Sequence, residues 1–496
     1  MAARNCLKFL LGHEARTLDA VDPTATVLDY LRLEERRTGT KEGCAEGDCG
    51  ACTVVVARPS PEGGLRYQAV NACIQPLGTL DGAQLITVED LAAADGTLHP
   101  VQQAMVDCHG SQCGFCTPGF VMSLFAMTKE GFPPETDDQA IDEILAGNLC
   151  RCTGYAPIAR AAHGLAAMEI TDGFDARREE TQAALAAMDD GADVSLTEDE
   201  TRWFHAPASA DGLAELMLQY PDATIVAGAT DVGLWLTKHL MRPDPLIWLG
   251  RARDLATIEE TTTDITIGAG VTYSDALAHL SWTWPDFGAV VRRIGSTQIR
   301  NAGTIGGNVA NGSPIGDTPP MLIALGARLH LRQGRIRRVI PIEDFFIDYG
   351  KQDRAPGEFV EAVTIPRPAP GQIFKAYKLS KRFDQDISAV MGAFSLFVDE
   401  GRIVTARVAF GGMAGTPKRS PSAEAALTGH TLEKSAFETA MRALAIDFKP
   451  LTDMRASAAY RLKAAQNMLM RVFIEVTDED AATRLWDKRG IDDAGL

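Results

Sequence analysis

Residues 111–119 read SQCGFCTPG and residues 147–155 read GNLCRCTGY, and these two segments carry four of the ten cysteines of the chain. The first holds a Cys-x-x-Cys pair and the second a Cys-x-Cys pair, with 33 residues between the two pairs. Four thiolates can hold a tetrahedral zinc ion or a 2Fe-2S cluster. The one-residue gap favours a cluster, because two thiolates so close in sequence reach one ion with difficulty. Zinc, and more remotely ordinary reduced cysteines, stay open on this spacing alone.

A second set of cysteines lies nearer the start of the chain. Three of them follow the spacing Cys-x4-Cys-x2-Cys at Cys44, Cys49 and Cys52, and Cys73 comes next, which is the plant-type ferredoxin ligand pattern. The loop over residues 43–52, GCAEGDCGAC, is rich in glycine and alanine. Small residues suit a loop whose backbone amides fold closely over cluster sulfides. This set therefore favours a 2Fe-2S site over zinc.

The order of these motifs resembles the two iron-sulfur domains of the xanthine dehydrogenase and aldehyde oxidase family of molybdenum hydroxylases. The match covers roughly residues 5–165. The resemblance implies that Cys44, Cys49, Cys52 and Cys73 ligate one cluster, and that Cys113, Cys116, Cys150 and Cys152 ligate the other. It also implies that Gln112 lies against the pterin of a molybdenum cofactor held elsewhere.

Composition and charge set limits on the class of protein. The 496 residues are 46% hydrophobic and 23% charged, which is ordinary for globular domains, and suffice for about three of them. A net charge of −18 argues against nucleic acids and anionic membranes as partners. All ten cysteines lie at or before Cys152, which fits metal ligands in a reducing compartment better than a disulfide scaffold. Cys6 and Cys108 remain outside both sets, and we expect them to be buried core thiols.

Neither a targeting segment nor a membrane span is evident. The apolar run near the start is broken by Lys8 and is not followed by a cleavage pattern of small residues. No segment approaches the ~18 uninterrupted apolar residues that a membrane span needs. We therefore expect a cytoplasmic protein.

Local patterns predict the elements around the cysteines. Residues 5–11 and the segment after His13 predict a strand pair, residues 26–34 a short helix, and residues 53–57 a strand, as in a small half-barrel. The following region predicts helices: one is capped by Thr117 and ends at Gly131, one covers residues 141–145, and one starts near Pro157. The polar residues at 168–202 predict a solvated linker that contains an alanine-rich piece of helical composition, and a partner-binding segment is the alternative.

Two glycine-containing segments raise the question of a nucleotide. Residues 224–234, TIVAGATDVGL, predict a strand, a tight turn and a helix start that could present amides to a pyrophosphate, although such turns are common without phosphate. Residues 300–317, RNAGTIGGNVANGSPIGD, gather small and amide residues before a helix that Asp317 could cap. Neither segment has the Gly-x-Gly-x-x-Gly pattern of a Rossmann site.

The resemblance extends to these segments, which are similar to the two flavin-binding loops of the same family's FAD domain. That domain shares its fold with vanillyl-alcohol oxidase-type flavoproteins. The resemblance implies FAD contacts from the first loop, the second loop and three further positions: Ile225, Val226, Ala227, Gly228, Ala229, Thr230, Asp231, Val232, Thr304, Gly307, Asn308, Asp317, Ile294, Val360 and Lys378.

The expected fold is therefore α+β and multidomain. A plant-type ferredoxin-like β-grasp domain at 1–90 precedes a helical 2Fe-2S domain of two hairpins at 91–167. After a linker at 168–202 come an FAD-binding domain at 203–370 and a small α+β domain at 371–496, with a strand at 402–410 and helices over 422–444 and 456–472.

The resemblance implies the iron-sulfur and FAD subunit of a two-subunit xanthine dehydrogenase of the bacterial type. Nothing in the chain resembles the family's molybdopterin domains, so we expect a molybdopterin-binding large subunit as partner, in a dimer of heterodimers. Electrons from hypoxanthine or xanthine, which are oxidised to urate, would pass through both clusters to FAD and then NAD. No side chain here is expected to act as a catalytic acid, base or nucleophile. The alternatives are a subunit of a hydroxylase for an aldehyde or N-heterocycle, and a free-standing electron-transfer flavoprotein.

Overall fold

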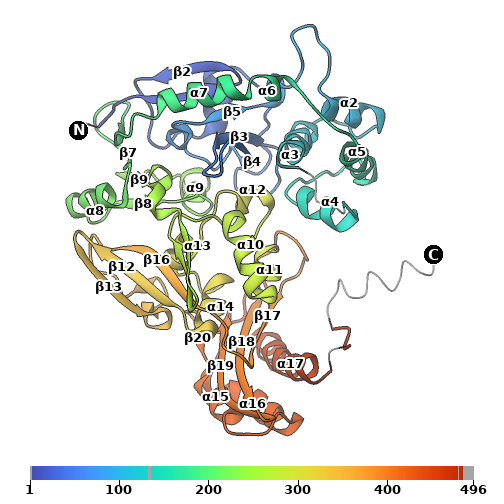
Figure 1. Ribbon diagram of the computed structural model, residues 1–496, viewed down its shortest axis with the longest axis vertical. Helices are drawn as coiled ribbons and strands as arrows, with labels where there is room; N and C mark the ends of the chain where they lie inside the picture. Colours follow the sequence, from blue (N-terminus) through green and yellow to red (C-terminus); the bar gives the residue numbers. More distant parts are fainter. Residues whose placement is uncertain (1–2, 132–135, 479, 484–496) are drawn as a thin grey trace.

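The computed structural model describes residues 3–131, 136–478 and 480–483, and it has a multidomain α+β architecture. Figure 1 shows the parts that bear the cysteines at one end of the long axis, in blue and cyan. The C-terminal sheet and its helices occupy the opposite end, and the region of the two glycine-containing loops lies between them. The cysteine sets and these loops therefore belong to adjoining parts of one folded body.

The N-terminal part is a five-stranded sheet with the order β2-β1-β5-β3-β4. Its strands are β1 Leu7–Leu11, β2 Glu14–Leu18, β3 Thr53–Pro59, β4 Leu65–Asn71 and β5 Gln84–Ile86. β1 and β5 run parallel, and the other neighbours are antiparallel. The predicted strand pair, helix and strand are confirmed, although the helix begins as α1 Val27–Asp29 and continues as a wider π-helical turn, Tyr30–Glu34.

Strand β3 is buried on both of its faces. Because successive side chains of a strand point to opposite sides, Val54 and Val56 lie in one hydrophobic cluster and Val55 and Ala57 in another. The first cluster extends to β9 Leu246–Trp248 of the middle region, and the second extends to the helices that follow the sheet. The sheet is therefore held between its two neighbouring parts.

The described residues of the second part form four helices, as expected: α2 Pro100–Asp107, α3 Thr117–Glu130, α4 Asp138–Leu145 and α5 Ala156–Ala166. The long helix α3 packs against β3 and β4 and ends at Gly131. The prediction that Thr117 caps this helix is wrong. Cys116 occupies the N-cap position, and the Thr117 hydroxyl lies 2.8 Å from the Ser111 hydroxyl instead.

The segment between the helical part and the middle region is not a solvated linker over its whole length. It forms α6 Gly173–Ala176 and α7 Arg178–Met188, and α7 lies against β1 and β3. Leu185 is 1% exposed, so the alanine-rich helix α7 has a buried apolar side against the first sheet, and Phe174 of α6, 4% exposed, packs against Phe125 of α3. The many charged residues of this segment hid these buried positions.

The middle region contains two sheets, with the orders β6-β7-β9-β8 and β10-β11-β16-β12-β13, and a small hairpin. The strands are β6 Val194–Leu196, β7 Phe204–Ala206, β8 Thr224–Val226, β10 Ile258–Glu260, β11 Asp264–Gly268, β12 Arg328–Gln333, β13 Ile336–Pro341, β14 Phe346–Asp348, β15 Lys351–Gln352 and β16 Phe359–Pro366. The helices are α8 Ala210–Gln219, α9 Val232–Thr237, α10 Tyr273–Thr283, α11 Pro285–Val291, α12 Thr297–Arg300, α13 Ile305–Asn311 and α14 Thr318–Leu325. The predicted strand, turn and helix at 224–234 correspond to β8, its following loop and α9.

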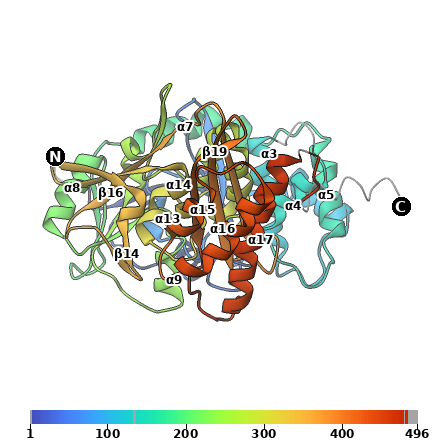
Figure 2. The same cartoon turned by 90° about the horizontal axis from the view of Figure 1, so that it is seen from below.

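The last part is a four-stranded sheet, β17-β18-β19-β20, covered by helices. Its elements are β17 Gln372–Leu379, β18 Val390–Asp399, β19 Arg402–Gly411, β20 Lys418–Arg419, α15 Pro421–Leu427, α16 Lys434–Asp447 and α17 Ala458–Thr477. Figure 2 shows the three helices together at this end of the molecule. The helix expected over 422–444 is interrupted, because Gly429, at φ +83°, turns the chain so that its N–H bonds to the carbonyl of Ile403.

Cys6 and Cys108 are partly exposed rather than buried as expected. Cys6 precedes β1, and Cys108 is the last residue of the α2 turn, where it packs only against the edge of the helical core. Both positions lie at the ends of elements, where burial is incomplete. None of the helices in the described part of the chain combines the length and apolarity needed to cross a lipid bilayer.

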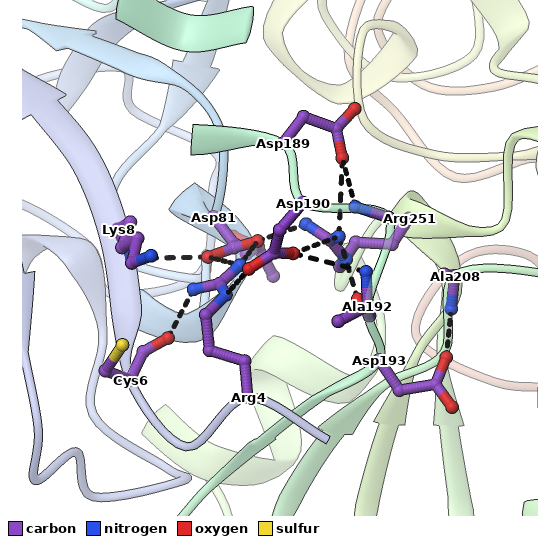
Figure 3. A network of polar contacts seen from close by, with 12 residues as sticks. Arg4, Cys6, Lys8, Asp81, Asp189, Asp190, Ala192, Asp193, Ala208 and Arg251 are labelled. Atoms are coloured by element: carbon purple, nitrogen blue, oxygen red, sulfur yellow. Dashed lines mark hydrogen bonds and ion pairs between the residues drawn. The ribbon is translucent and has the colours of Figure 1, made fainter. Parts of the chain in front are cut away.

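A buried network of charges joins the N-terminal strands to the middle region (Figure 3). The carboxylate of Asp81 is fully buried, and it forms ion pairs with Arg4, at 2.8 Å, and with Arg251. The backbone N–H of Lys8 also donates to it, at 3.2 Å. Arg4 extends the network to Asp190, at 2.8 Å. Asp81 and Arg251, 170 residues apart in the sequence, are thereby fixed together.

Candidate cluster and flavin sites

The strand register brings the first cysteine set together. β3 and β4 are antiparallel, with Thr53 opposite Asn71, so the start of β3 and the end of β4 share one edge of the sheet. Cys52 precedes β3 and Cys73 follows β4, and these two side chains are 1% and 2% exposed. Cys44 and Cys49, which are partly exposed, come from the loop before β3.

The thiols of this set contact one another. Hydrogen bonds to Cys49 and then to Cys73 hold the pKa of Cys44 well below its usual range. The same contact with Cys44 raises the pKa values of Cys49 and Cys73. The Cys49 N–H lies 3.4 Å from the Cys44 sulfur. Such mutual dependence is expected where several thiols share one small volume.

Glycines make room for this arrangement. A Cβ at Gly43 would lie 2.7 Å from the Cys49 sulfur, and Gly47 and Gly50 take φ values of +77° and +67°. These are left-handed conformations that other residues adopt only with strain. The sulfur-only donor set and the close glycine loop fit a 2Fe-2S cluster.

The second cysteine set lies where helices begin and end. Cys113 and Cys116 lie before and at the start of α3, and Cys150 and Cys152 lie between α4 and α5. The thiols pair across the two segments, Cys113 with Cys152 and Cys116 with Cys150. All four predicted ligands are therefore brought together, and their donor chemistry also fits a 2Fe-2S cluster.

The electrostatics of the second set follow from these pairs. Burial, and then the contact with Cys150, raises the pKa of Cys116 to about 12. A hydrogen bond from the Phe115 backbone, and then the contact with Cys152, lowers the pKa of Cys113. The Thr153 hydroxyl lies 3.2 Å from the Cys150 sulfur as a further donor.

In neither set do the thiols surround a single point. Among the residues that the structure describes, no group of three or more His, Cys, Asp and Glu side chains has the arrangement of ligands around one metal ion. A 2Fe-2S cluster distributes its four thiolates over two irons, so convergence on one position is not required. The contacts between pairs of thiols are therefore the feature of each set that bears on cluster binding.

The two cysteine loops touch each other through their backbones. The N–H of Leu149, the residue before Cys150, donates to the carbonyl of Cys49 at 3.0 Å. Gly50 and Gly147 permit this approach, because a Cβ on Gly50 would collide with the Gly147 carbonyl. Cys49 of the first set is thus connected to Cys150 of the second set by the Leu149–Cys49 hydrogen bond and the peptide bond between Leu149 and Cys150.

The two predicted flavin loops also lie side by side. Gly228 lies so close to Ala302 that a Cβ would collide with the Ala302 carbonyl. A Cβ on Gly303 would lie 3.3 Å from the Thr230 hydroxyl, and one on Gly307 would lie 3.6 Å from the Ala227 methyl. The structure therefore brings the 225–232 segment and the start of the 304–317 segment together.

Their local structure leaves one buried hydrogen-bond acceptor available to a ligand. Ile225 and Val226 end β8, Ala227 to Thr230 form the turn, and Asp231 and Val232 begin α9. Thr304 caps α13 through the Gly307 N–H, at 2.9 Å. The buried side-chain oxygen of Asn308 has no hydrogen-bond partner within the described residues. An unpaired polar atom beside a close-packed glycine turn fits a bound flavin nucleotide.

Asp317 and Lys378 form a buried ion pair. Their side chains are 6% and 3% exposed, and Nζ of Lys378 lies 2.5 Å from Oδ2 of Asp317. The Ser388 hydroxyl donates to Oδ1 of Asp317 at 2.5 Å. Asp317 makes no capping hydrogen bond to α14, so the prediction of a helix cap is wrong. The side chain is instead held by Lys378 of β17 and by Ser388, which lies two residues before β18.

The remaining predicted residues are more dispersed. Val360, 5% exposed, lies in β16 within the same hydrophobic cluster as two residues of α13. Ile294 follows α11 and packs against that cluster from its edge. Gln112 is exposed in the loop between α2 and α3, beside the second cysteine set rather than beside the flavin loops.

Sequence reasoning missed several polar side chains at these sites. Thr153 stands inside the quoted motif and was available as a donor to the neighbouring sulfur, whereas no local pattern singles out Ser388 or Gln298. Ser388 reaches Asp317 from 71 residues away, and Gln298 reaches Ser123 from 175 residues away. Contacts of this kind depend on the tertiary arrangement.

Comparison with protein families gives matches over most of the chain. The matching models are described as a 2Fe-2S iron-sulfur cluster binding domain (residues 11–76), a [2Fe-2S] binding domain (87–163), an FAD binding domain in molybdopterin dehydrogenase (197–368) and a CO dehydrogenase flavoprotein C-terminal domain (375–476). Both cysteine sets and both flavin loops fall within the corresponding ranges.

Similar proteins include large curated enzymes. Xanthine dehydrogenase of Emericella nidulans is 31% identical over 95% of this chain and 39% of its own length. Xanthine dehydrogenase 1 of Arabidopsis thaliana is 31% identical over 85% of this chain and 36% of its own length. The chain thus spans about two fifths of the length of the curated relatives it matches.

Similar solved structures include two bacterial enzymes. Carbon monoxide dehydrogenase from Hydrogenophaga pseudoflava has a TM-score of 0.52 at 28% identity, covering 54% of this chain and 94% of that chain. Quinoline 2-oxidoreductase from Pseudomonas putida 86 has a TM-score of 0.51 at 26% identity, covering 55% of this chain and 95% of that chain. The fold of about half of the chain is therefore shared with these two enzymes.

Proposed function

This chain belongs to the molybdenum hydroxylase family, and we propose that it is the iron-sulfur and FAD subunit of a two-subunit xanthine dehydrogenase. The observation that carries the proposal is the direct backbone contact between two four-thiol loops, in a chain that also has two flavin-type loops. The units proposed are residues 1–90, 91–167, 203–370 and 371–496, joined by 168–202. When bound, the clusters supply one-electron transfer, and the flavin exchanges electrons singly or in pairs.

The spatial order of the chain's own residues supports a direction for the electrons. Cys113 and Cys152 of the second set are exposed, whereas Cys52 and Cys73 of the first set are buried. The first set also adjoins the flavin-type region, because the Thr237 hydroxyl of α9 donates to the Ala45 carbonyl at 2.7 Å. We therefore propose that electrons enter at the second set, continue through the first set and leave at the flavin.

Helix α9 makes this connection short. It begins at Val232, directly after Asp231 of the first flavin loop, and its Thr237 reaches the loop that carries Cys44. Gly233 of the same helix lies so close to Ile74 that a Cβ would collide with the Ile74 carbonyl, one residue beyond Cys73. Short separations favour electron transfer, so the packing of α9 serves the proposed route.

The proposed partner is a molybdopterin-binding large subunit, in a dimer of heterodimers. The surface around the second cysteine set supports this, because Phe115, Leu149 and Tyr155 are 47%, 42% and 43% exposed there. Exposed aromatic and apolar side chains that surround a functional group are typical of a docking surface. Gln112 lies on the same surface, where it would contact the pterin.

Xanthine as substrate and NAD as acceptor are the finer parts of the proposal. They rest on the curated relatives, which are xanthine dehydrogenases, and on the fused order of cluster and flavin domains. A cytoplasmic location is also part of the proposal, because thiol sets at metal-ligand spacing suit a reducing compartment. A second candidate, a subunit that serves another substrate, is favoured by the likeness to carbon monoxide dehydrogenase and quinoline 2-oxidoreductase.

The test is purification with the natural partner, followed by assays with a panel of electron donors. We expect a molybdenum-containing chain to copurify and xanthine to drive reduction of NAD⁺. Turnover of only quinoline, an aldehyde or carbon monoxide would move the function to the second candidate. An active flavoprotein with no molybdenum-containing partner would contradict the proposal and indicate a free-standing electron carrier.

A further inference from the structure

A single side chain of the middle region reaches into the contact between the two cysteine-bearing parts. Gln298 lies in the short helix α12 and is 1% exposed. Its amide nitrogen lies 3.1 Å from the Ser123 hydroxyl, 3.2 Å from the Asn148 side-chain oxygen and 3.3 Å from the Thr53 hydroxyl. Ser123 and Asn148 belong to the helical part, and Thr53 starts β3 of the first sheet.

The acceptors of Gln298 are themselves bonded to the cysteine loops. The Asn148 amide donates to the Gly50 carbonyl at 3.1 Å and approaches the Thr53 hydroxyl at 3.3 Å. The Ser123 hydroxyl donates to Asn148 at 2.6 Å. Gly50 follows Cys49, and Asn148 lies two residues before Cys150. The polar cluster of Gln298, Ser123, Asn148, Thr53 and Gly50 therefore adjoins both predicted ligand loops.

The buried position of the Gln298 side chain is energetically unfavourable, which argues that this residue has a specific role. The side-chain oxygen of Gln298 is buried and has no hydrogen-bond partner within the described residues. It lies against Gly147, where no Cβ would fit. A buried acceptor without a partner is destabilising, and an apolar residue of similar size would avoid that penalty. Gln298 thus holds the two cysteine loops through its amide nitrogen, while its side-chain oxygen stays buried without a hydrogen bond.

We propose that Gln298 is a positioning residue, which sets the separation of the two clusters from the flavin side of the interface. It is the member of the polar cluster that comes from the flavin-type region, and it holds Asn148 and Thr53 at once. The Leu149–Cys49 hydrogen bond lies directly beside it. In this proposal, docking of the flavin-type region aligns the two cysteine loops. The proposal rests on the proposed function for the identity of the clusters.

The test compares Gln298→Leu with the wild type, each purified as the full chain with its natural partner. In the fully reduced protein we expect the magnetic splitting between the two cluster signals in electron paramagnetic resonance to decrease. We also expect the Leu149 amide to exchange with deuterium about tenfold faster, because the contact that protects it is loosened. Neither readout depends on turnover.

Gln84→Leu is the matched control. Gln84 is fully buried, donates one hydrogen bond to the Gly12 carbonyl at 2.8 Å, and also has a buried side-chain oxygen without a partner in the described chain. It lies in β5, outside the polar cluster, so it reproduces the loss of a buried amide without the positioning effect. In Gln84→Leu, the magnetic splitting of the cluster signals and the exchange rate of the Leu149 amide should equal those of the wild type.

Unchanged splitting and unchanged Leu149 exchange in Gln298→Leu would overturn the proposal. If that variant does not fold, Ser123→Ala is the second test, because it removes one acceptor of Gln298 with a smaller change of the side chain. We then expect a smaller decrease of the magnetic splitting and a smaller increase of the Leu149 exchange rate. Ser123→Ala identical to the wild type would then overturn it. A wild type without clusters would contradict the proposed function instead, while Leu149 exchange would still report whether Gln298 aligns the loops.

Discussion

Cys73 is the member of the first thiol set that lies outside the loop at 43–52, and its side chain is 2% exposed between β4 and the flavin-type region. We expect Cys73→Ser to lose the first cluster and therefore about half of roughly four irons per chain, because serine replaces a thiolate ligand. Iron analysis measures this loss. Cys108→Ser, outside both sets, should keep the wild-type iron content. Full iron in Cys73→Ser would contradict the ligand assignment.

The Asp317–Lys378 pair gives a second expectation for a single side chain. Replacing Asp317 by asparagine leaves the ammonium of Lys378 buried without its counter-charge, and breaking a buried pair in this way costs about 3–5 kcal/mol. Urea denaturation followed by flavin fluorescence measures the change. Asp348→Asn, at an exposed position of β14, is the control. A loss below about 1 kcal/mol would show that the pair is relaxed or hydrated.

The contacts of Asp172 allow a prediction of how the stability of the helical part depends on pH. It lies 2.8 Å from His99 and 2.6 Å from Lys129. Burial opposes its charge, but the hydrogen bonds from His99 and Lys129 hold its pKa well below the usual range. Below about pH 3.9 this carboxylate is protonated in the unfolded chain but still ionised in the folded protein. The free energy of unfolding therefore decreases as the pH decreases.

Urea unfolding at several pH values, followed by circular dichroism, tests this dependence. Asp172→Asn should be less stable near neutral pH and should lose stability less steeply below about pH 4. Asp138→Asn is the control, because the Asp138 side chain is 91% exposed. Parallel pH profiles for the wild type and Asp172→Asn would contradict the assignment.

For single residues, the sequence predicted the site well where the chemistry of the ligand requires one residue type. All eight predicted cysteine ligands come together in two sets of four, because the spacing of thiols is itself the signal. Asp317 and Thr117 were misjudged as helix caps, since either role needs only a polar residue before a helix. Which polar group lies nearby was decided by tertiary contacts.

Among the elements, the backbone contact between the cysteine loops has the clearest consequence. Gly50 and Gly154 have φ values of +67° and +68°, so alanine strains both by a similar amount, about 1–2 kcal/mol. Only at Gly50 does a Cβ also collide with the Gly147 carbonyl, whereas nothing lies within 4 Å of one at Gly154. Gly50→Ala should therefore alter the visible circular dichroism of the clusters, and Gly154→Ala should not. Identical spectra for the two variants would contradict the close contact.

Periodicity predicted many of the elements but not where each of them packs. The alternating residues of β19 and the apolar face of α3 were evident, and both elements are present. The position of α7 on the first sheet was not evident, because Leu185 stands among alanines and Phe174 stands among charged residues. The break at Gly429 was missed because its cause is a hydrogen bond to β19.

For the molecule as a whole, the network around Asp81 holds the N-terminal part against the middle region. Asp81→Asn leaves Arg4 and Arg251 close together without the carboxylate between them, and we expect a loss of about 3–5 kcal/mol. Thermal unfolding and limited proteolysis between residues 190 and 203 should both report the weakened docking. Asp95→Asn, on an exposed turn, is the control. Equal resistance to protease in both variants would show that the sheets alone hold the parts together.

This arrangement of parts lay beyond what the sequence could predict. Arg4 and Arg251 meet at Asp81, and Gln298 meets Ser123, without any local pattern that marks these residues. The domain types were predictable, because each carries its own motif. Their mutual placement depends on isolated polar residues whose partners are far away in the sequence.

The central claim is that one chain holds two 2Fe-2S clusters and one flavin in a connected series. Its most direct test is the iron, sulfide, zinc and flavin content of the purified chain. The account predicts about four irons, about four sulfides and about one FAD per chain, with no stoichiometric zinc. Zinc in place of iron, or about two irons per chain with both thiol sets intact, would contradict it.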